Sequence, residues 1–326
     1  MSILITGGAG YIGSHMVLAA LDRGDEVVVL DNLSTGIRAL VPEEAHFHQG
    51  HVGDQTLLRR LFAYYRITAV IHFAGSIVVP ESVEKPLAYY ANNTMASRNL
   101  IEACVQSGVK SFIFSSTAAV YGVPGHNPVT EADKLVPINP YGRSKLMTEW
   151  MLEDAARAHD FRYVALRYFN VAGADPAGRT GQSTPNATHL IKRACQAALG
   201  RIPNLDIFGT NYPTRDGTGI RDYIHVSDLV AAHALALDHL QQNGASTVLN
   251  CGYGHGFSVR EVIDKVSSVV GKKVPTREAP PRPGDAAELV ADSSRLQAQL
   301  GWRPAYDDLE EIVSTAYAWE RRLNSA

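Results

Sequence analysis

The stretch SILITGGAGYIGSHMVLAAL, residues 2–21, joins a short apolar run to a cluster of glycines and a second apolar segment. Its apolar start predicts a buried strand, and the segment after the glycines predicts a helix. Gly8, Gly10 and Gly13 fit the spacing G-x-G-x-x-G, and Gly7 begins an overlapping G-x-x-G-x-x-G. Glycines here permit a tight turn, close approach of a diphosphate to the backbone, and close helix–strand packing. The stretch therefore predicts a dinucleotide-binding turn.

The segment that follows strengthens this prediction. DEVVVLDN, residues 25–32, predicts a second strand that ends in Asp31, about twenty residues after the glycines. An acidic side chain at this place binds the 2′-hydroxyl of an adenine ribose. Because a carboxylate repels a 2′-phosphate, Asp31 favours NAD over NADP.

Alternating strands and helices continue along the first half of the chain. Strands are expected over residues 45–52, 67–75 and 109–117, and helices over residues 55–66 and 86–107. This alternation predicts an α/β protein with a doubly wound parallel sheet whose ligands lie at the carboxyl ends of the strands. The short sequences FAG (73–75) and SST (115–117) fall at two such ends.

A tyrosine and a lysine follow in NPYGRSK, residues 139–145. Asn139 fits a helix N-cap and Pro140 the first helical position, so Tyr141 and Lys145 would share one helix face. A neighbouring ammonium favours the phenolate and lowers the tyrosine pKa, which predicts a general acid or base. Such pairs are common on helix surfaces, so this interpretation depends on the dinucleotide site.

Composition narrows the class of protein. The formal net charge of the 326 residues is −3, which gives no global attraction to nucleic acid or anionic membranes. The three cysteines are far apart and contain no C-x-x-C pair, as expected for buried thiols in a reducing compartment without a metal site. No signal peptide or membrane-spanning apolar run is evident, which predicts a cytoplasmic protein.

Five motifs in consistent order carry a family resemblance: TGGAGYIG, FAG, FSSTAAVYG, NPYGRSK and LRYFNVAGA. They resemble the extended short-chain dehydrogenase/reductase family. The later GTGIRDYIHVSDL and RPGDAAELVADSS are similar to its UDP-glucose 4-epimerases, and the similarity runs from Ile3 to about Trp319. The resemblance implies a Rossmann-type NAD-binding domain over residues 1–168 and a smaller, mixed substrate-binding region over 169–326. The chain is expected to cross back into the first domain around 210–250.

The resemblance also implies a reaction. Tyr141 would be the acid/base acting on the 4-hydroxyl of a UDP-hexose, and Lys145 would bind the nicotinamide ribose and lower the tyrosine pKa. Thr117 would bridge the 4-hydroxyl and the phenol, with Ser116 as the weaker candidate. Tightly bound NAD would take hydride from carbon 4, the 4-keto sugar would turn over, and returning hydride would invert carbon 4.

Further residues are assigned by the same resemblance. The cofactor-binding residues it implies are Gly7, Gly10, Tyr11, Ile12, Gly13, Asp31, Asn32, His51, Val52, Phe73, Ala74, Gly75, Asn92, Ser115, Tyr141, Lys145 and Tyr168. The substrate-binding residues it implies are Thr117, Asn170, His189, Leu190, Ile207, Phe208, Arg221, Arg282, Asp285 and Leu289. Arginine suits a diphosphate because its planar fork makes two charge-assisted hydrogen bonds at once.

Two positions depart from the family pattern. His51 stands where an aspartate usually contacts the adenine, and Ile77 replaces a common lysine, which puts both cofactor contacts in doubt.

Leu289 matches the residue that walls the sugar pocket. Its size lies between the aromatic residue of enzymes restricted to glucose and galactose and the small residue of those accepting N-acetyl sugars.

Alternative functions remain at this point. A nucleotide-sugar 4,6-dehydratase of this family carries Asp-Glu after the active-site threonine, whereas Ala118 and Ala119 follow Thr117 here. A UDP-pentose or UDP-uronate epimerase would use the same catalytic residues and stays open. A noncatalytic NAD-sensing protein would need none of Thr117, Tyr141 and Lys145. By family analogy, the helices at 86–107 and 141–158 are expected to form the four-helix interface of a homodimer.

Overall fold

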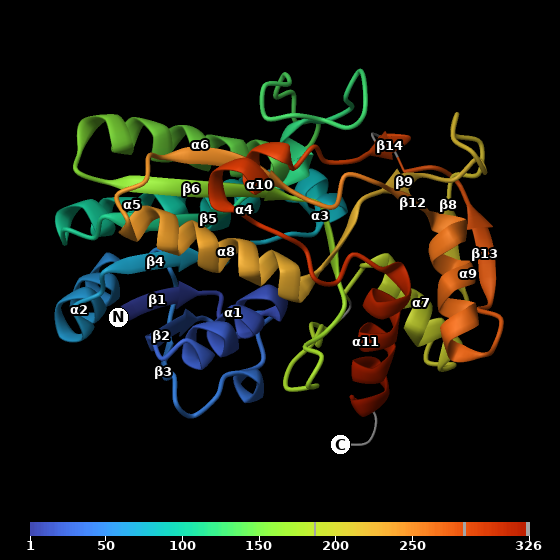
Figure 1. Ribbon diagram of the computed structural model, residues 1–326, viewed down its shortest axis with the longest axis horizontal. Helices are drawn as coiled ribbons and strands as arrows, with labels where there is room; N and C mark the ends of the chain where they lie inside the picture. Colours follow the sequence, from blue (N-terminus) through green and yellow to red (C-terminus); the bar gives the residue numbers. More distant parts are fainter. Residues whose placement is uncertain (186, 283–284, 324–326) are drawn as a thin grey trace.

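Across the described residues, 1–185, 187–282 and 285–323, the computed structural model contains a seven-stranded parallel sheet at its centre (Figure 1). The strand order is β11-β6-β5-β4-β1-β2-β3. The strands are β1 (Ser2–Thr6), β2 (Glu26–Asp31), β3 (His46–Gln49), β4 (Ala69–His72), β5 (Ser111–Ser115), β6 (Arg162–Tyr168) and β11 (Thr247–Cys251). Because all neighbours run parallel, their carboxyl ends meet at one edge of the sheet.

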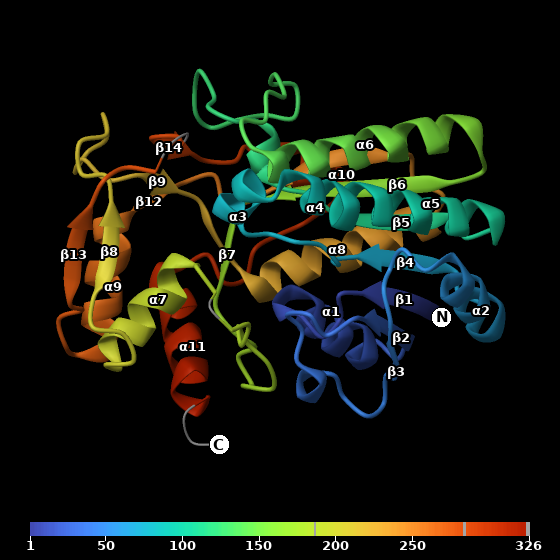
Figure 2. The ribbon, with the colours of Figure 1, turned by 180° about the vertical axis from the view of Figure 1, so that it is seen from behind.

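Helices cover both faces of this sheet, as Figures 1 and 2 show. The side chains of Ile3 and Ile5 pack into one buried cluster and that of Leu4 into another, because successive strand residues point to opposite faces. The first cluster includes α1 (Tyr11–Asp22), α8 (Val226–Gln241) and α10 (Ser294–Leu300). The second includes α2 (Gln55–Tyr65), α5 (Ala96–Gln106) and α6 (Pro140–Ala158). The predicted doubly wound α/β fold is confirmed.

The helix expected over residues 86–107 is not one regular α-helix. It consists of α4 (Pro86–Tyr89), a π-helical segment η2 (Tyr90–Met95) and α5, and it follows α3 (Val79–Glu84). The wide turn carries Asn93, whose Nδ2 donates to Ser144 Oγ at 3.0 Å and to the Ser76 carbonyl at 3.0 Å. A π-helical segment is defined by its i→i+5 hydrogen bonds, which hydrophobic periodicity does not reveal.

The second half of the chain adds a smaller, mixed region. Its helices α7 (Leu190–Ala198), α9 (Val259–Val270) and α11 (Leu309–Arg322) share one buried apolar cluster. Its short strands form a parallel pair, a mixed three-stranded sheet and a second parallel pair. These strands are β8 (Leu205–Phe208) with β13 (Thr276–Ala279), β9 (Ile220–Arg221) with β12 (Phe257–Ser258) and β14 (Glu288–Leu289), and β7 (Asn170–Ala172) with β10 (Tyr223–His225). Two 3₁₀ turns, η1 (Arg38–Leu40) and η3 (Ala118–Val120), lie in the first half.

The two halves of the sequence are interleaved. Strand β11 pairs in parallel with β6, so residues 247–251 extend the central sheet, and α8 packs on that sheet. The division into domains after residue 168 therefore stays a prediction. Within the described residues, no helix is both long enough and apolar enough to cross a membrane.

Candidate active site

The glycine turn lies between β1 and α1, against the end of β4. Gly7 has a φ of +70°, and a Cβ atom there would lie 2.7 Å from the backbone nitrogen of Ala74. A Cβ atom at Gly13 would overlap the Gly7 carbonyl oxygen. Any larger side chain at either position would push the strands and the helix apart. The turn thus has the close approach that a dinucleotide diphosphate at the N-terminus of α1 requires.

Asp31 closes the other side of this cradle at the end of β2. It is buried and accepts hydrogen bonds from the backbone nitrogens of Ala9, at 3.0 Å, and Leu33, at 2.8 Å. Since an ionised carboxylate has about four acceptor positions, two remain for ribose hydroxyls. Asp31 thus fits the place predicted for it, and it also ties the glycine turn to the second strand.

Most of the remaining predicted cofactor residues lie at strand ends along the same edge. Phe73, Ala74 and Gly75 follow β4, whereas Ser115 and Tyr168 end β5 and β6 and hydrogen-bond to each other through their hydroxyls. The others are Ile12 in α1, Asn32 after β2, His51 and the buried Val52 after β3, and Asn92 in η2. The parallel sheet therefore brings together segments separated by more than one hundred residues.

The two departures from the family pattern lie near Ser76. His51 Nε2 is 3.2 Å from Asn92 Oδ1, and Asn92 Nδ2 donates to Ser76 Oγ at 2.8 Å. Ile77, by contrast, is half exposed and forms an apolar surface position. His51 is thus part of a polar chain at this edge, whereas Ile77 offers no hydrogen bond to a cofactor.

Thr117, Tyr141 and Lys145 come together where β5 ends and α6 begins. Asn139 caps α6 as predicted, with its side chain accepting from the Gly142 nitrogen at 2.8 Å. Lys145 Nζ donates to the carbonyl of Ser115 at 2.8 Å. The Thr117 hydroxyl lies close enough to the Tyr141 phenol to lower its pKa, and all three side chains are buried. The three predicted catalytic residues thus form one cluster.

Burial dominates the electrostatics of this cluster. Burial raises the pKa of Tyr141, and the nearby Thr117 hydroxyl opposes that rise only in part. Burial also lowers the pKa of Lys145 to about 8. Lys145 directs its ammonium at the Ser115 carbonyl, and desolvation is the larger influence on the Tyr141 pKa in the chain alone. The lowering of the tyrosine pKa by Lys145 stays a prediction for the protein with NAD bound.

Ser116 and Thr117 point in different directions. Ser116 is fully buried, and its hydroxyl donates to the carboxylate of Glu149. Thr117 is the residue of the pair that contacts Tyr141. This geometry favours Thr117 over Ser116 as the hydroxyl next to a substrate.

The arginines predicted to bind a diphosphate act electrostatically on Tyr212, which the sequence did not predict. Arg282 lies over the ring of Phe208, with its guanidinium carbon 3.9 Å from the ring centroid. Burial and the charge of Asp285 raise the pKa of Tyr212, and the charges of Arg221 and Arg282 oppose this. The charges of Asp285, Arg221 and Arg282 thus reach the Tyr212 phenol. The signal that could have found Tyr212 is its place in the glycine- and proline-containing loop after β8.

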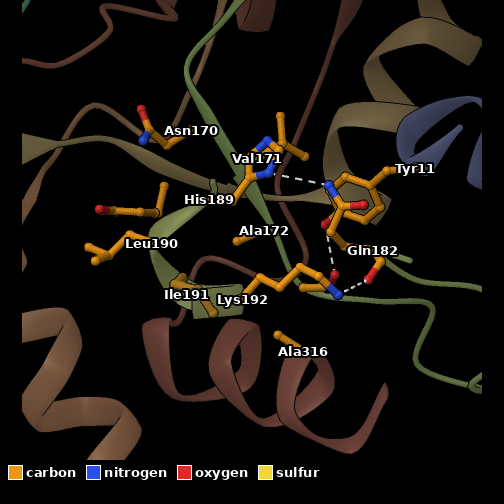
Figure 3. A pocket seen from close by; sticks show the side chains of 12 residues that line it. Tyr11, Asn170, Val171, Ala172, Gln182, His189, Leu190, Ile191, Lys192 and Ala316 are labelled. Atoms are coloured by element: carbon orange, nitrogen blue, oxygen red, sulfur yellow. Dashed lines mark hydrogen bonds between the residues drawn. The ribbon is translucent and has the colours of Figure 1, made fainter. Parts of the chain in front are cut away.

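A cavity of about 30 Å³ is lined by residues predicted to bind the cofactor and by others predicted to bind the substrate (Figure 3). Tyr11, a predicted cofactor residue, lines it together with the predicted substrate residues Asn170, His189 and Leu190. The Tyr11 hydroxyl donates to the Gly173 carbonyl at 2.7 Å, and burial lowers the pKa of His189 to about 4. His189 is thus a neutral imidazole at physiological pH. Gln182, Lys192 and Tyr223 also line this cavity and were not predicted.

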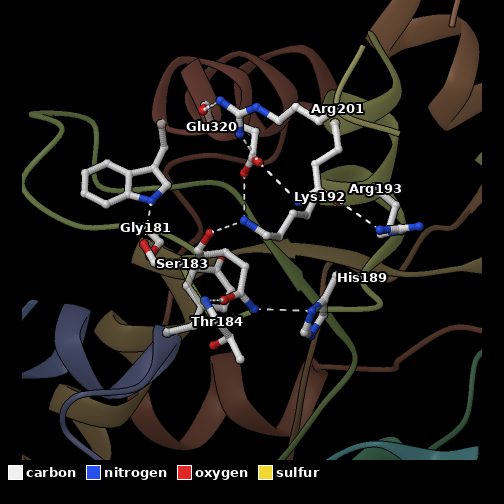
Figure 4. A network of polar contacts seen from close by, with 12 residues as sticks. Gly181, Ser183, Thr184, His189, Lys192, Arg193, Arg201 and Glu320 are labelled. Atoms are coloured by element: carbon white, nitrogen blue, oxygen red, sulfur yellow. Dashed lines mark hydrogen bonds and ion pairs between the residues drawn. The ribbon is translucent and has the colours of Figure 1, made fainter. Parts of the chain in front are cut away.

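A buried charge network supports this side of the site (Figure 4). Lys192 Nζ donates to Glu320 at 2.7 Å and to the Gln182 carbonyl at 2.6 Å, and Arg201 also pairs with Glu320. Gln182 in turn contacts His189, with 3.3 Å between Nε2 and Nδ1. Helix α11 thereby holds the segment that begins α7.

Leu289 lies next to η3, the turn that follows Thr117. It pairs with Arg221 in the register of β14 and β9, and its side chain packs against a cluster that includes Ala118, Tyr121 and Phe169. Ile207, predicted as a uracil contact, is buried in β8, whereas Phe208 is half-buried. Leu289 is thus placed between Arg221, which is predicted to bind the diphosphate, and the residues that follow Thr117. In the motif that carries Leu289, Pro283 and Gly284 lie outside the described residues.

Comparison with known proteins agrees with this site. Residues 3–252 match the NAD dependent epimerase/dehydratase family. The chain is 58% identical, over 324 residues, to a UDP-glucose 4-epimerase of Azospirillum brasilense, an alignment that covers 99% of this chain and 93% of the relative.

Two solved structures share the fold. A UDP-glucose 4-epimerase from Brucella ovis in complex with NAD has a TM-score of 0.94 and 45% identity, over 97% of each chain. A UDP-glucose 4-epimerase from Bifidobacterium longum in complex with NAD⁺ and UDP has a TM-score of 0.94 and 36% identity, over 99% of this chain and 98% of that one. The chain therefore belongs to the NAD-dependent epimerase/dehydratase family.

Proposed function

We propose that the chain is a UDP-glucose 4-epimerase, which reversibly inverts carbon 4 of UDP-glucose and UDP-galactose. The observation that carries this proposal is the buried cluster of Thr117, Tyr141 and Lys145, which lies beside the dinucleotide cradle. The similarity to proteins named UDP-glucose 4-epimerase, over nearly the whole chain, supports the same substrate.

Each residue has a defined task in the proposed reaction. Tyr141 accepts the proton of the 4-hydroxyl and later returns it, with Thr117 bridging the two oxygens. Lys145, the glycine turn and Asp31 would hold NAD, which would accept the hydride of carbon 4 and give it back to the other face of the sugar. The arginines Arg221 and Arg282 hold the diphosphate, with Asp285 on the uridine ribose. The 4-keto sugar then turns about its link to the diphosphate and presents its other face.

The direct test is product analysis after separate incubations with UDP-glucose, UDP-xylose and UDP-glucuronate. We expect UDP-galactose from the first at the highest rate. Faster conversion of the pentose or the uronate would favour the corresponding epimerase, which uses the same catalytic residues. A 4,6-dehydratase is disfavoured because Ala118 and Ala119 supply no acid after Thr117. Loss of water from the product would contradict the assignment.

Cofactor choice follows from Asp31. NAD is expected to raise the thermal stability and activity of cofactor-depleted protein, whereas NADP should do neither, because the carboxylate meets a 2′-phosphate with like charge. The measurement is the melting temperature and rate with each cofactor at equal concentration. As control, Asp31→Asn should narrow the difference between the cofactors. Equal stabilisation of the unmodified protein by NADP would contradict this role of Asp31.

Leu289 is expected to disfavour N-acetyl sugars. The N-acetyl group needs space during rotation, and overpacking a filled site costs roughly 1–3 kcal/mol, about five- to a hundredfold in rate. We expect UDP-glucose to be preferred over UDP-N-acetylglucosamine, and Leu289→Ser to narrow the ratio of the two kcat/KM values. Leu309→Ser, which alters the buried cluster of the second region, serves as control and should leave that ratio unchanged. A ratio unmoved by Leu289→Ser would remove Leu289 from the pocket wall.

We also propose a homodimer formed through α4–α5 and α6. This surface carries exposed apolar side chains, namely Leu87, Met95 and Trp150. It also carries a groove of about 430 Å³ lined in part by Ile101, Val105 and Met151. The buried free thiols of Cys104, Cys195 and Cys251 support a cytoplasmic location for this dimer.

Trp150→Asp is expected to dissociate the dimer. Aromatic residues at interfaces often contribute about 2 kcal/mol or more, so the dimer Kd should rise roughly 30-fold or more. Sedimentation velocity over a dilution series measures this change. The control is Tyr64→Asp, which removes an aromatic side chain that is 80% exposed on α2 and outside the proposed interface. Equal dissociation of the two variants, or of neither, would contradict the proposed surface.

A further inference from the structure

A buried polar chain of hydrogen-bonded side chains begins at Ser116. It adjoins the catalytic turn, by which we mean Thr117 and the η3 turn that it caps. The Ser116 hydroxyl donates to Glu149, and Glu149 is held by Arg167 through hydrogen bonds of 2.6 to 3.2 Å. Both partners of this ion pair are about 95% buried. Glu149 lies one helical turn after Lys145 on the same face of α6, because residues four apart are neighbours. Lys145 and Glu149 therefore grip Ser115 and Ser116, the two residues that precede Thr117.

The polar chain continues from Arg167 away from α6. Arg167 donates to the Tyr121 hydroxyl at 3.1 Å, and that hydroxyl donates to Asn250 Oδ1 at 2.6 Å. Tyr121 and Asn250 are both buried. Tyr121 follows η3, the turn that Thr117 caps, whereas Asn250 is in β11, the last strand of the central sheet. The polar chain thus crosses three elements that are far apart in the sequence.

Its far end reaches the strand that carries Leu289. Asn250 Nδ2 donates to the Val129 carbonyl at 2.9 Å, and the Val129 nitrogen donates to the Val290 carbonyl at 2.8 Å. The side chain of Asn127 donates at 3.1 Å to the Glu288 carbonyl in β14 and accepts at 2.9 Å from the nitrogen of Val290, which follows β14. The segment 127–129 therefore connects the polar chain to β14.

The buried ion pair of Glu149 and Arg167 is a poor source of stability by itself. Taking two charges out of water costs several kcal/mol each, and buried pairs are often no more stabilising than apolar residues of similar volume. Fully satisfied buried networks do rigidify their surroundings and specify one arrangement. Here one end of the network is Ser116, the residue before Thr117, and the other end is joined through Val129 to Val290, the residue that follows Leu289 and β14.

We propose that the hydrogen-bonded chain Ser116–Glu149–Arg167–Tyr121–Asn250 is a positioning device that fixes the catalytic turn relative to the sugar-facing strand β14. The inference rests on the proposed epimerase function. Ser116, Glu149, Arg167, Tyr121 and Asn250 are positioning residues, since they act on the substrate through Thr117 and Leu289.

Two single-hydroxyl deletions test the two halves of this device. Ser116→Ala should lower kcat by about tenfold with KM for UDP-glucose within about twofold, because a displaced turn weakens transition-state contacts while the diphosphate anchors remain. Tyr121→Phe should lower kcat by roughly three- to tenfold and should also reduce the preference for UDP-glucose over UDP-N-acetylglucosamine, because residues in one network are coupled. A purely structural role would leave this preference unchanged.

Matched controls remove a hydroxyl at similarly buried positions that are not part of the polar chain. Thr148→Val is next to Glu149 on α6 and deletes a bond to the Ser144 carbonyl, and Tyr163→Phe deletes a phenol in β6. Both should keep kcat, KM and substrate preference within about twofold of the unmodified protein. NAD content and melting temperature are measured for every variant, so that loss of folded protein is distinguished from loss of positioning.

The outcomes separate this inference from the proposed function. If the unmodified protein does not epimerise UDP-glucose, the proposed function fails and the inference falls with it. If the unmodified protein is active and Ser116→Ala retains its kcat, the positioning role alone is overturned. The same holds if both test variants lose activity only in proportion to folded protein, or if the controls lose as much as the test variants.

Discussion

Tyr141→Phe is expected to lower kcat about 10²- to 10⁴-fold while the protein stays folded and retains NAD, because general acid–base catalysis typically contributes that much. The phenol is buried against Thr117, and phenylalanine keeps its packing but removes the proton-transferring oxygen. Steady-state kinetics with UDP-galactose, together with the NAD content and melting temperature of the variant, measure this effect. Tyr163→Phe serves as the control for the loss of a buried phenol.

Thr117→Ala gives a graded comparison with this result. Its loss should be smaller than that of Tyr141→Phe, because water can partly replace a bridging hydroxyl. A larger loss for the threonine variant would mean that the two roles are misassigned. Undiminished epimerisation by Tyr141→Phe would remove the tyrosine from the reaction.

The sequence predicts the central sheet well because its signals are local. The apolar run before the glycines forms β1 (Ser2–Thr6), and the second predicted strand forms β2, which ends at Asp31 as expected. Asn139 and Pro140 begin α6 as their capping chemistry predicts. The π-helical segment η2 is the exception, because the amphipathic pattern continues through it while the backbone hydrogen bonds change.

The site is less predictable where burial decides its chemistry. Tyr141 and Lys145 were expected to interact directly, yet burial moves both pKa values toward the neutral forms and Lys145 bonds a backbone carbonyl. The motif NPYGRSK fixes which residues share a helix face. It does not indicate how much water reaches them, because desolvation depends on segments far away in the sequence.

Contacts between distant segments are the other missing information. Glu149 and Arg167 look like solvated charges on a helix and at the end of a strand, yet they form one buried ion pair. Tyr212 likewise stands out only in the folded protein, where the charges of Arg221, Arg282 and Asp285 act on its phenol. A single sequence contains no signal for such pairings, since neither periodicity nor spacing relates residues that meet only in the folded chain.

The second large expected effect is a loss of stability in the buried charge network of Glu320, Lys192 and Arg201 (Figure 4). Glu320→Gln is expected to lower the free energy of unfolding by about 3–5 kcal/mol, because removing one partner leaves buried charge uncompensated. Glu320 is 4% exposed and pairs with both Lys192 and Arg201, while Gln196 donates to it at 3.2 Å. Because glutamine has nearly the same size as glutamate, the loss of unfolding free energy measures the effect of removing the negative charge. Urea unfolding at fixed NAD concentration measures it, with the slope m checked for constancy.

The network also predicts an asymmetry between its members. Lys192→Met should cost less than Glu320→Gln, because Arg201 still neutralises the carboxylate and methionine retains most of the apolar stem. Glu278→Gln, which breaks an exposed pair with Arg260, should cost about 0–1 kcal/mol and serves as the control. Equal losses for Lys192→Met and Glu320→Gln would mean that the lysine, rather than the shared carboxylate, organises this side of the site. A loss for Glu320→Gln no larger than that of the exposed control would mean that water compensates the two cations. Either result would reassign the role of α11, whereas the expected order makes Glu320 the one group on which both cations depend.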